Sequence, residues 1–446
     1  MIRPAVSLSL LLVLVCGPLN AQAPNTPPNP QTAPPPVSSS GTPLNLAQAE
    51  AIAIKSNPQI TIGRLRALEA QQFVRESRSA LMPTANLSLT AVDANPGSRL
   101  TAGFLNNPIL FPRAAGGASV SQLVTDFGRT TNLLSSSEFG AKSEDQNAQA
   151  TRADILLAVD QAFYSSLNTQ ALVRVAQDTV QARQALVDKV QALTDAKLKS
   201  ELDLSFSKVE LARAKLLLLE ARNNFQTALA GLSAILGYTD EQNFHLVEET
   251  APLVPPAPEV ESLIQQAMQQ RPEIKALQFE VESAQKFSGA EHDLWRPSVN
   301  ALGVVGEAPV RDNHIPNWYG AVGVNINIPV FNGFLYNARA KAADLQTEVS
   351  RQKLADLRNN IARDVRNSWQ DTNRAYERLS VTEQLRQQAS LALDLAQARY
   401  NLGLGSIVEF TQAELQKTEA DIAGTDATYQ YRLTQMVLAF TIAAPK

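Results

Sequence analysis

The residues of this chain that could do chemistry are few, and their spacing argues against an enzyme. The three histidines, at positions 245, 292 and 314, lie far apart in the sequence, which leaves little material for a metal site or a histidine-based catalytic centre. The nearest candidate constellation is Glu291-His292-Asp293, near the end of a predicted helix. Consecutive residues point in different directions around a helix and do not converge on one substrate. We therefore predict no catalytic residue, no metal ligand and no cofactor.

The only cysteine, Cys16, lies in a segment typical of a secretory signal peptide, which we assign to residues 1–23. Arg3 is followed by an apolar run from Ala5 to Val15, which is too short to span a bilayer, and then by small residues. Two interpretations of Cys16 are open. It could be acylated, although Val15 is bulkier than the residue that normally precedes such a site. Alternatively it is removed with the signal, which leaves the mature chain without a thiol.

Charge excludes one class of partner. The chain has 39 basic and 43 acidic residues, so it lacks the basic surface that nucleic-acid binding requires. No further segment has eighteen consecutive apolar residues, so the sequence predicts no transmembrane helix.

The elements that remain are helices of unusual length. The stretch from Phe334 to Leu402 contains neither glycine nor proline, the two residues that helix interiors disfavour. Its apolar residues fall mostly three to five apart, as in a helix with one apolar side. At 1.5 Å per residue such a helix reaches roughly 100 Å. The stretch from Ala141 to Ala230 is equally free of both residues and must turn once. The function must be one that requires a very long helix.

The chain is an internal duplication, and such repeats define its organisation. Two proline landmarks return 214 residues later, and near the end of each half the shift is close to 206; the matched positions are Asn57-Pro58 with Arg271-Pro272, Met82-Pro83 with Arg296-Pro297, and Ser200 with Ser406. We therefore divide the chain into a signal peptide, a Pro-rich tether, a first repeat, a Pro-rich linker and a second repeat, at residues 1–23, 24–45, 46–250, 251–258 and 259–446.

Each repeat is predicted to contain two strands, one long helix and a shorter return helix. Polar and apolar residues alternate in the four predicted strands, at about 84–92, 119–126, 298–306 and 319–329. The long helices are expected to run to about 197 and over about 334–402, and the return helices over about 201–236 and 407–442.

Strands of about nine alternating residues suit a tilted membrane β-barrel, and the alternative is a small soluble sheet. Four strands cannot close a membrane barrel, and an open edge in lipid would leave backbone groups unpaired, so several chains would have to pool their strands. Aromatic residues would mark the two membrane interfaces: Trp295, Phe127 and Phe331 at the helix side, Trp318 and Tyr319 at the loop side. For Trp295, packing in a core is an equal alternative.

In this order and spacing, the landmarks resemble the TolC-type family of outer-membrane efflux and secretion channels. The similarity is sharpest at Tyr400-Asn401-Leu402-Gly403-Leu404-Gly405-Ser406-Ile407-Val408-Glu409, which is similar to the family's periplasmic turn. The resemblance implies an α+β membrane protein. Its duplicated strand-hairpin and long-helix repeats form, as a homotrimer, a 12-stranded outer-membrane β-barrel continuous with a 12-helix periplasmic α-barrel. The implied partners are outer-membrane lipid, a periplasmic adaptor (membrane fusion) protein and an inner-membrane pump, and the last two open a closed tip.

The tip turns are expected to dock the adaptor, although an ordinary helix–helix turn is the alternative. They comprise Leu198, Lys199 and Ser200 in the first half, and Gly403, Leu404, Gly405 and Ser406 in the second. The first turn lacks the glycine of the second, which puts a symmetric docking surface in doubt.

Two aspartates are equivalent under the 206-residue shift. Asp188 and Asp394 each lie twelve residues before their turn serine, so both sit at the same height, roughly 18 Å from the tip if helical. In a trimer they would form a ring of carboxylates at a lumen constriction. The alternative is that both are solvated on the outer face.

We therefore expect a passive outer-membrane exit duct of a tripartite efflux or type I secretion system. The alternative is a periplasmic coiled-coil adaptor or scaffold, but such proteins usually have a single helical hairpin, which the duplicated plan does not match. The sequence does not name the cargo.

Overall fold

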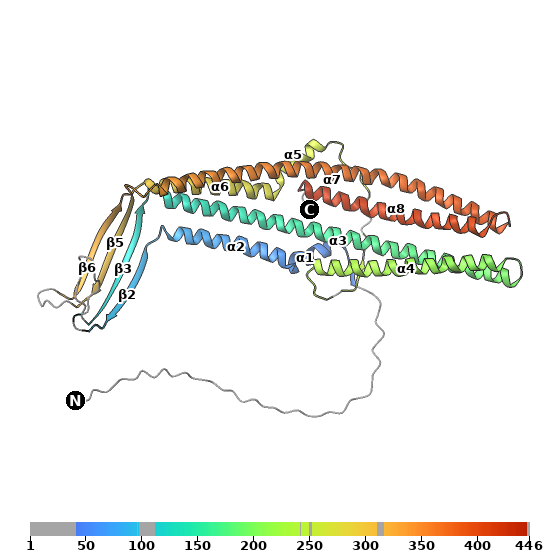
Figure 1. The fold of residues 1–446 in the computed structure, drawn as a ribbon, viewed down its shortest axis with the longest axis horizontal. Helices are drawn as coiled ribbons and strands as arrows, with labels where there is room; N and C mark the ends of the chain where they lie inside the picture. Colours follow the sequence, from blue (N-terminus) through green and yellow to red (C-terminus); the bar gives the residue numbers. More distant parts are fainter. Residues whose placement is uncertain are drawn as a thin grey trace, which may run out of the picture. The chain divides into compact units, whose positions relative to one another are not determined.

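The computed structural model describes residues 42–95, 97, 112–240, 242–248, 252–309 and 316–443. The predicted signal peptide with Cys16, most of the predicted tether, and His314 lie outside the described residues. The unit that starts at Gly41 consists of long helices that run side by side and a sheet that continues from one end of them (Figure 1).

The helices are α1 (Leu46–Ser56), α2 (Pro58–Ser79), α3 (Arg129–Asp195), α4 (Glu201–Ile235), α5 (Val260–Gln270), α6 (Pro272–His292), the short 3₁₀ helix η1 (Asp293–Trp295), α7 (Leu335–Asn401) and α8 (Ile407–Thr441). The strands are β1 (Thr42–Leu44), β2 (Thr84–Val92), β3 (Arg113–Thr125), β4 (Phe244–Leu246), β5 (Ser298–Glu307) and β6 (Trp318–Asn327). Among the described residues, no helix has the length and apolar character needed to cross a membrane.

The two halves of the chain repeat one another in helix length. The long helices α3 and α7 have 67 residues each, and the return helices α4 and α8 have 35 each. Each long helix therefore reaches roughly 100 Å, and each return helix covers about half of it. The other half of each long helix is accompanied by α2 or α6, which lead into the strands (Figure 1).

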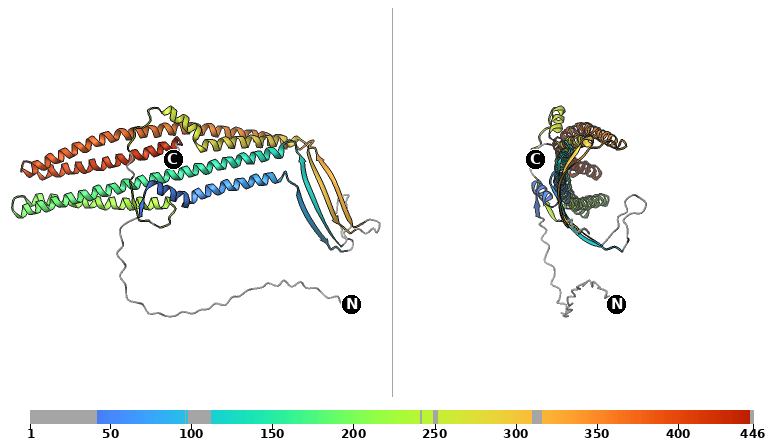
Figure 2. Two further views of the ribbon diagram at one scale, coloured as in Figure 1. Left: turned by 180° about the vertical axis from the view of Figure 1, so that it is seen from behind. Right: turned by 90° about the vertical axis from the view of Figure 1, so that its left-hand side faces the viewer.

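The long helices form a single layer whose order follows from their contacts. Near the tip the order is α4, α3, α8, α7, and near the sheet it is α2, α3, α6, α7. Helix α7 is therefore one edge of the layer along its whole length, and α2 together with α4 is the other. Figure 2 shows this layer from behind and from one end.

The large sheet is antiparallel, with the order β2-β3-β5-β6. One row of paired residues crosses all four strands: Ser88 pairs with Gly117, Gly117 with Gly306, and Gly306 with Tyr319. Because side chains alternate between faces, this row presents one face and the rows beside it present the other. Within the described chain, β2 and β6 are edge strands, each with one side unpaired.

The second strand of the sheet begins earlier than the sequence predicts. The sequence predicts this strand from about residue 119, after the glycines at positions 116 and 117, because glycine usually weakens strands. The structure has β3 from Arg113, with Gly116 opposite Leu89. A Cβ atom at position 116 would lie 2.9 Å from Cδ2 of Leu89, so the absent side chain makes room for the leucine on the neighbouring strand.

The end of the predicted tether is also structured. Thr42–Leu44 is not flexible chain but strand β1, which pairs in parallel with β4. Its Leu44 is buried in a core cluster with residues of α1, α3 and α4. The Pro-rich composition that predicts a tether therefore ends at this strand rather than at residue 45.

Candidate functional site

The two tip turns have the same backbone. Lys197 (φ 59°) and Gly403 (φ 73°) are both left-handed, and each is followed by a helix with a serine N-cap. Leu198 N donates to Leu193 O at 2.8 Å, and Leu404 N donates to Arg399 O at 2.9 Å. The absence of glycine from the first turn therefore does not break the symmetry of the two turns.

The turns present matching apolar side chains. Leu198 and Leu404 are 70% and 69% exposed, and one turn further along the return helices Leu202 and Val408 are exposed as well. Both pairs are related by the 206-residue shift. Exposed large apolar residues at the end of a polar helical hairpin are typical of a binding surface.

Beneath the turns, a cluster of buried residues joins the two hairpins. Tyr400 stacks on Phe410 with ring centroids 5.5 Å apart, and the Lys199 ammonium lies 4.0 Å from the centroid of the Tyr400 ring. Burial, with a smaller contribution from the Asp203 carboxylate, raises the pKa of the Tyr400 hydroxyl. Within the part of the chain that the structure describes, this hydroxyl is buried and has no hydrogen-bond partner. The sequence gives Tyr400 as part of the turn motif, but not its role in the core of the tip.

Polar contacts also join the hairpins near the tip. Lys189 donates to Asn401 Oδ1 at 2.8 Å. Further up, the Arg183 guanidinium of α3 forms a buried ion pair with Glu414 of α8. Burial lowers the pKa of Arg183, and the nearby Glu210 carboxylate opposes that shift. Sequence reasoning missed this pair, because i-to-j pairing between distant helices leaves no local signal.

Asp188 and Asp394 are both exposed in the single chain. Gln184 donates to Asp188 Oδ1 at 2.9 Å, a contact within one helix turn. The single chain does not bring the two aspartates into contact with each other, and a ring would require further copies.

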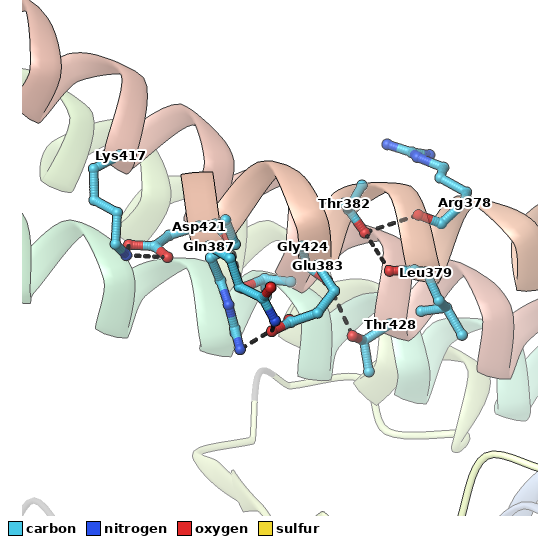
Figure 3. Close-up of polar contacts among 11 residues, drawn as sticks. Arg378, Leu379, Thr382, Glu383, Gln387, Lys417, Asp421, Gly424 and Thr428 are labelled. Atoms are coloured by element: carbon cyan, nitrogen blue, oxygen red, sulfur yellow. Dashed lines mark hydrogen bonds and ion pairs between the residues drawn. The ribbon is translucent and has the colours of Figure 1, made fainter. Parts of the chain in front are cut away.

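The polar surface of α7 and α8 is satisfied mostly within each helix. In Figure 3, Thr382 Oγ1 donates to the carbonyls of Arg378 and Leu379, and Glu383 accepts from Gln387 at 3.1 Å. Lys417 pairs in the same way with Asp421 on α8. Side chains that pair along their own helix need no partner on another helix, which is consistent with a helical layer that has one face in contact with water.

A strap of extended chain, which comprises the described residues between Leu246 and Ala257, crosses the helical layer at mid-height. Its residues bind three successive helices: Leu246 exchanges two hydrogen bonds with Gln170 of α3, Val254 O accepts from Tyr431 and Gln435 of α8, and Ala257 O accepts from Trp369 of α7. Helices α1 and α5, which flank this strap, lie on one side of the layer (Figure 2). The linker predicted at residues 251–258 is therefore, where described, a strap fastened to the helices.

The two joints between stacked helices differ. Where α4 ends beside α2, Asn57 Nδ2 donates to Ile235 O at 2.8 Å and closes the joint. At the equivalent place beside α8, Arg271 stands instead of asparagine, with its guanidinium bound to Glu273 and lying over the ring of Phe440. A cavity of about 440 Å³ opens there. Burial raises the pKa of the Asp154 carboxyl, and the nearby Glu273 carboxylate adds a smaller increase.

The Glu291-His292-Asp293 segment does not form a catalytic constellation. His292 Nε2 lies 3.1 Å from Asp344 Oδ1 on α7, whereas Asp293 accepts from Asn132 on α3. The hydrogen bond from Ser288 and then that with His292 lower the pKa of Asp344. These side chains thus fasten the end of α6 to α7 and η1 to α3. Among the described residues, no cluster of three His, Cys, Asp or Glu side chains could hold a metal ion.

The predicted interfacial aromatic residues lie at the two ends of the sheet. At the helix end, Trp295 packs edge-on against Tyr336 and donates to Asn337 Oδ1 at 3.2 Å, and it remains partly exposed. Phe127 and Phe331 are exposed at the same end. At the loop end, Trp318 is exposed opposite Glu307.

Tyr319 and Trp318 point to opposite faces of the sheet. The sequence places Tyr319 with Trp318 in one aromatic belt, but consecutive strand residues point to opposite faces. A Cβ atom at Gly320 would touch the Trp318 ring, whereas Cβ atoms at Gly117 and Gly306 would collide with the Tyr319 hydroxyl. Trp318 therefore shares a face with Val322 and Val324, and Tyr319 shares the face of Asn325 and Asn327.

The sequence of this chain matches the family described as "Outer membrane efflux protein" over residues 51–238 and 263–443. Outer membrane protein TolC of Salmonella enteritidis is 20% identical over 411 residues, which cover 89% of this chain and 82% of that protein. The cobalt-zinc-cadmium resistance protein CzcC of Cupriavidus metallidurans is 25% identical over 322 residues, 71% of each chain.

Solved structures share the fold. The CmeC outer membrane channel of Campylobacter jejuni superposes with a TM-score of 0.76 at 15% identity, covering 89% of this chain and 85% of that one. The outer-membrane channel OprN gives a TM-score of 0.77 at 16% identity and 90% coverage of both chains. The predicted fold class, two strand hairpins joined to long-helix hairpins, is confirmed for the single chain.

Proposed function

Because this chain belongs to the outer membrane efflux protein family, we propose that three copies of it close into a passive exit duct, opened at its tip by a periplasmic adaptor and an inner-membrane pump. The protein is an outer-membrane channel that extends into the periplasm, and it is not an enzyme. The number of copies, the docking surface and the cargo are the proposed parts.

The observation that carries the trimer is the pair of unpartnered edges. At one edge, β6 and α7 leave a strand side open and expose large apolar residues; at the other, β2, α2 and α4 do the same. The exposed residues are Leu345, Val349, Val381, Leu385, Leu391 and Leu395 on α7, Ile62, Leu65, Leu68 and Phe73 on α2, and Leu202, Phe206, Val209, Leu216 and Leu219 on α4. The open side of β6 on one copy can pair with the open side of β2 on the next, and the apolar residues of α7 can pack against those of α2 and α4. This arrangement favours head-to-tail closure of identical copies.

Closure of three copies also provides enough strands for a complete membrane barrel. An open strand edge in lipid would leave backbone groups without hydrogen bonds, at several kcal/mol each. Four strands from each of three copies give a barrel of twelve, an even number within the known range. The face with Val322, Val324 and Ile326 would meet lipid, and the face with Asn325 and Asn327 would line the pore. The strap at mid-height would then lie outside the helical wall.

The tip turns would dock the adaptor. Leu198 and Leu404 are equivalent, strongly exposed and carried by turns of one geometry, so a trimer would present six similar contacts in a ring. Replacing both leucines with asparagine should abolish co-purification of the adaptor and export, while the trimer remains. Undiminished co-purification would place docking elsewhere. Bulky residues at Gly403 and Gly405 should also abolish export, but Gly403 is left-handed and Gly405 is crowded by Arg399 and Glu409, so that pair tests the turn as well.

Cross-linking tests the assembly. Leu216 on α4 and Leu385 on α7 lie on opposite edges of one copy and are both exposed, at similar heights of about 23 Å from the tip ends of their helices. A variant with cysteine at both positions, treated with a short bis-maleimide in outer membranes, should give covalent bands that end at three copies. Each single-cysteine variant is the control and should give no such ladder. Cross-linking confined to one copy, or a ladder beyond three, would overturn the closed trimer.

A further inference from the structure

Tyr319 lies in a cradle made by two glycines on neighbouring strands. Its hydroxyl is 2.5 Å from the place that a Cβ atom would occupy at Gly117, and 2.6 Å from that at Gly306. Gly306 is its partner on β5, and Gly117 is the next residue of the same row, on β3. The side chain therefore extends sideways across β5 toward β3, with its hydroxyl against the backbone.

This arrangement presents the ring rather than the hydroxyl. Tyr319 remains 45% exposed although its hydroxyl lies against the two glycines. The ring lies along the face of the sheet, so what it offers to a molecule passing over that face is an aromatic surface. Such surfaces stack with other rings in offset or edge-on arrangements.

Among the described residues of the sheet, Tyr319 is the large side chain on its face at this level. On its face of the sheet, the row contains only Ser88 and the two glycines, and the next residues on β6 are Ala321 and Gly323. Among the described strand residues of this face, the charged side chain is Arg113, four residues nearer the loops on β3. The row lies one residue pair from the loop end of β5 and β6.

We propose that Tyr319 is a cargo-contact residue, one of three that form an aromatic ring just inside the outer mouth and retard molecules that carry aromatic groups. This rests on the proposed trimeric duct. The sequence predicts an aromatic residue of the loop-side interface at this position; strand period places Tyr319 on the face of Asn325 and Asn327, where the two glycines accommodate it.

The test compares two cations of equal charge as blockers of the channel in planar bilayers. Benzyltrimethylammonium and hexyltrimethylammonium, added at the loop side, differ chiefly in the aromatic ring. In the wild type, the benzyl compound should block at a concentration about fivefold lower, the size expected for one aromatic pair. Tyr319→Leu keeps an apolar side chain but no ring, and should abolish the difference. Tyr319→Phe should retain it, because the hydroxyl faces the glycines.

The neighbouring Trp318→Leu variant is the matched control, because that side chain lies on the other face. It should leave the difference unchanged. Equal selectivity in the wild type and Tyr319→Leu would overturn the proposal and leave Tyr319 with only the task of filling the glycine cradle. Loss of the difference in Trp318→Leu but not in Tyr319→Leu would also overturn it. Failure of the duct itself would be recognised separately, as wild-type protein that gives no channels.

Discussion

Lys197 and Gly403, in the two tip turns, adopt the same left-handed backbone, with φ of 59° and 73°. Both stand at the C-terminal end of a 67-residue helix, and both precede a return helix of 35 residues. The two halves therefore share a left-handed backbone at this position, although only the second half has a glycine, the residue that adopts this conformation most easily. Left-handed backbone costs a residue with a Cβ atom roughly 1–2 kcal/mol.

Lys197→Gly should therefore stabilise the folded protein, by about 0.5–1 kcal/mol after the extra freedom of glycine in the unfolded chain is counted. Gly403→Lys is the matched reverse change and should destabilise it by a similar amount. Both free energies can be measured by urea unfolding of the purified protein. A lysine variant at 403 as stable as the wild type would show that neither turn is strained.

Tyr400 gives a second prediction, from a hydroxyl that has no hydrogen-bond partner among the described residues. A buried polar group without a hydrogen bond is unfavourable by about 1–3 kcal/mol. Tyr400→Phe removes that group and keeps the stack on Phe410, so stability should be unchanged or higher. Tyr400→Ala, by contrast, should lose about 3–5 kcal/mol because it empties the core of the tip. A phenylalanine variant that unfolds more readily than the wild type would reveal a partner for the hydroxyl in the assembled channel.

These two residues also show what could be predicted from the sequence. The long helices, the strands and the duplication follow from local pattern, since the exclusion of glycine and proline and the two-residue alternation act along the chain. Conformations set by neighbours in space do not. The first turn differs from the second in sequence, because a lysine at position 197 does not predict a left-handed backbone. Gly116 does not predict a strand, because the residue that requires a glycine there, Leu89, lies on another strand.

The candidate site divides in the same way. The turn residues could be located, because Ser200 and Ser406 cap helices with a local hydrogen-bond signature. The opposite orientations of Trp318 and Tyr319 follow from strand period, yet only the glycine cradle shows what the tyrosine contacts. Pairing between distant helices, as for Arg183 and Glu414, was not predictable from one sequence.

Tyr429 on α8 should make stability depend on alkaline pH. Burial, and then its hydrogen bond to Glu248 at 3.0 Å, raise the pKa of Tyr429 to about 12, against an ordinary value of 10. Because the folded pKa is the higher one, its contribution is complete below pH 10 and is lost as pH rises from 10 to 12, by at most about 2 kcal/mol. The difference in unfolding free energy between the wild type and Tyr429→Phe should shrink over that interval. A difference that is constant from pH 9 to pH 12 would contradict the raised pKa.

The buried pair of Arg183 and Glu414 gives a prediction about the tip. Removing one partner leaves a buried charge alone, which typically costs about 3–5 kcal/mol, whereas replacing both with apolar residues is often nearly neutral. Arg183→Met should therefore be strongly destabilising, and Arg183→Met combined with Glu414→Leu should recover most of the loss. A double-mutant cycle by urea unfolding measures the coupling. The exposed pair Arg363 and Asp364, treated in the same way, is the control and should give less than about 1 kcal/mol.

The last prediction concerns Asp188 and Asp394, which are equivalent under the duplication and exposed in the single chain. We propose that a trimer gathers six of these carboxylates at one height near the closed end of the lumen. Two such charges about 10 Å apart in water repel by only ~0.4 kcal/mol, but the repulsions add and a narrow lumen focuses the field. The ring should favour cations and bind divalent ions. Asp188→Asn combined with Asp394→Asn should reduce cation selectivity and block by divalent cations in planar bilayers, while trimers persist. Equal selectivity and equal block in the two proteins would place both aspartates on the outer face.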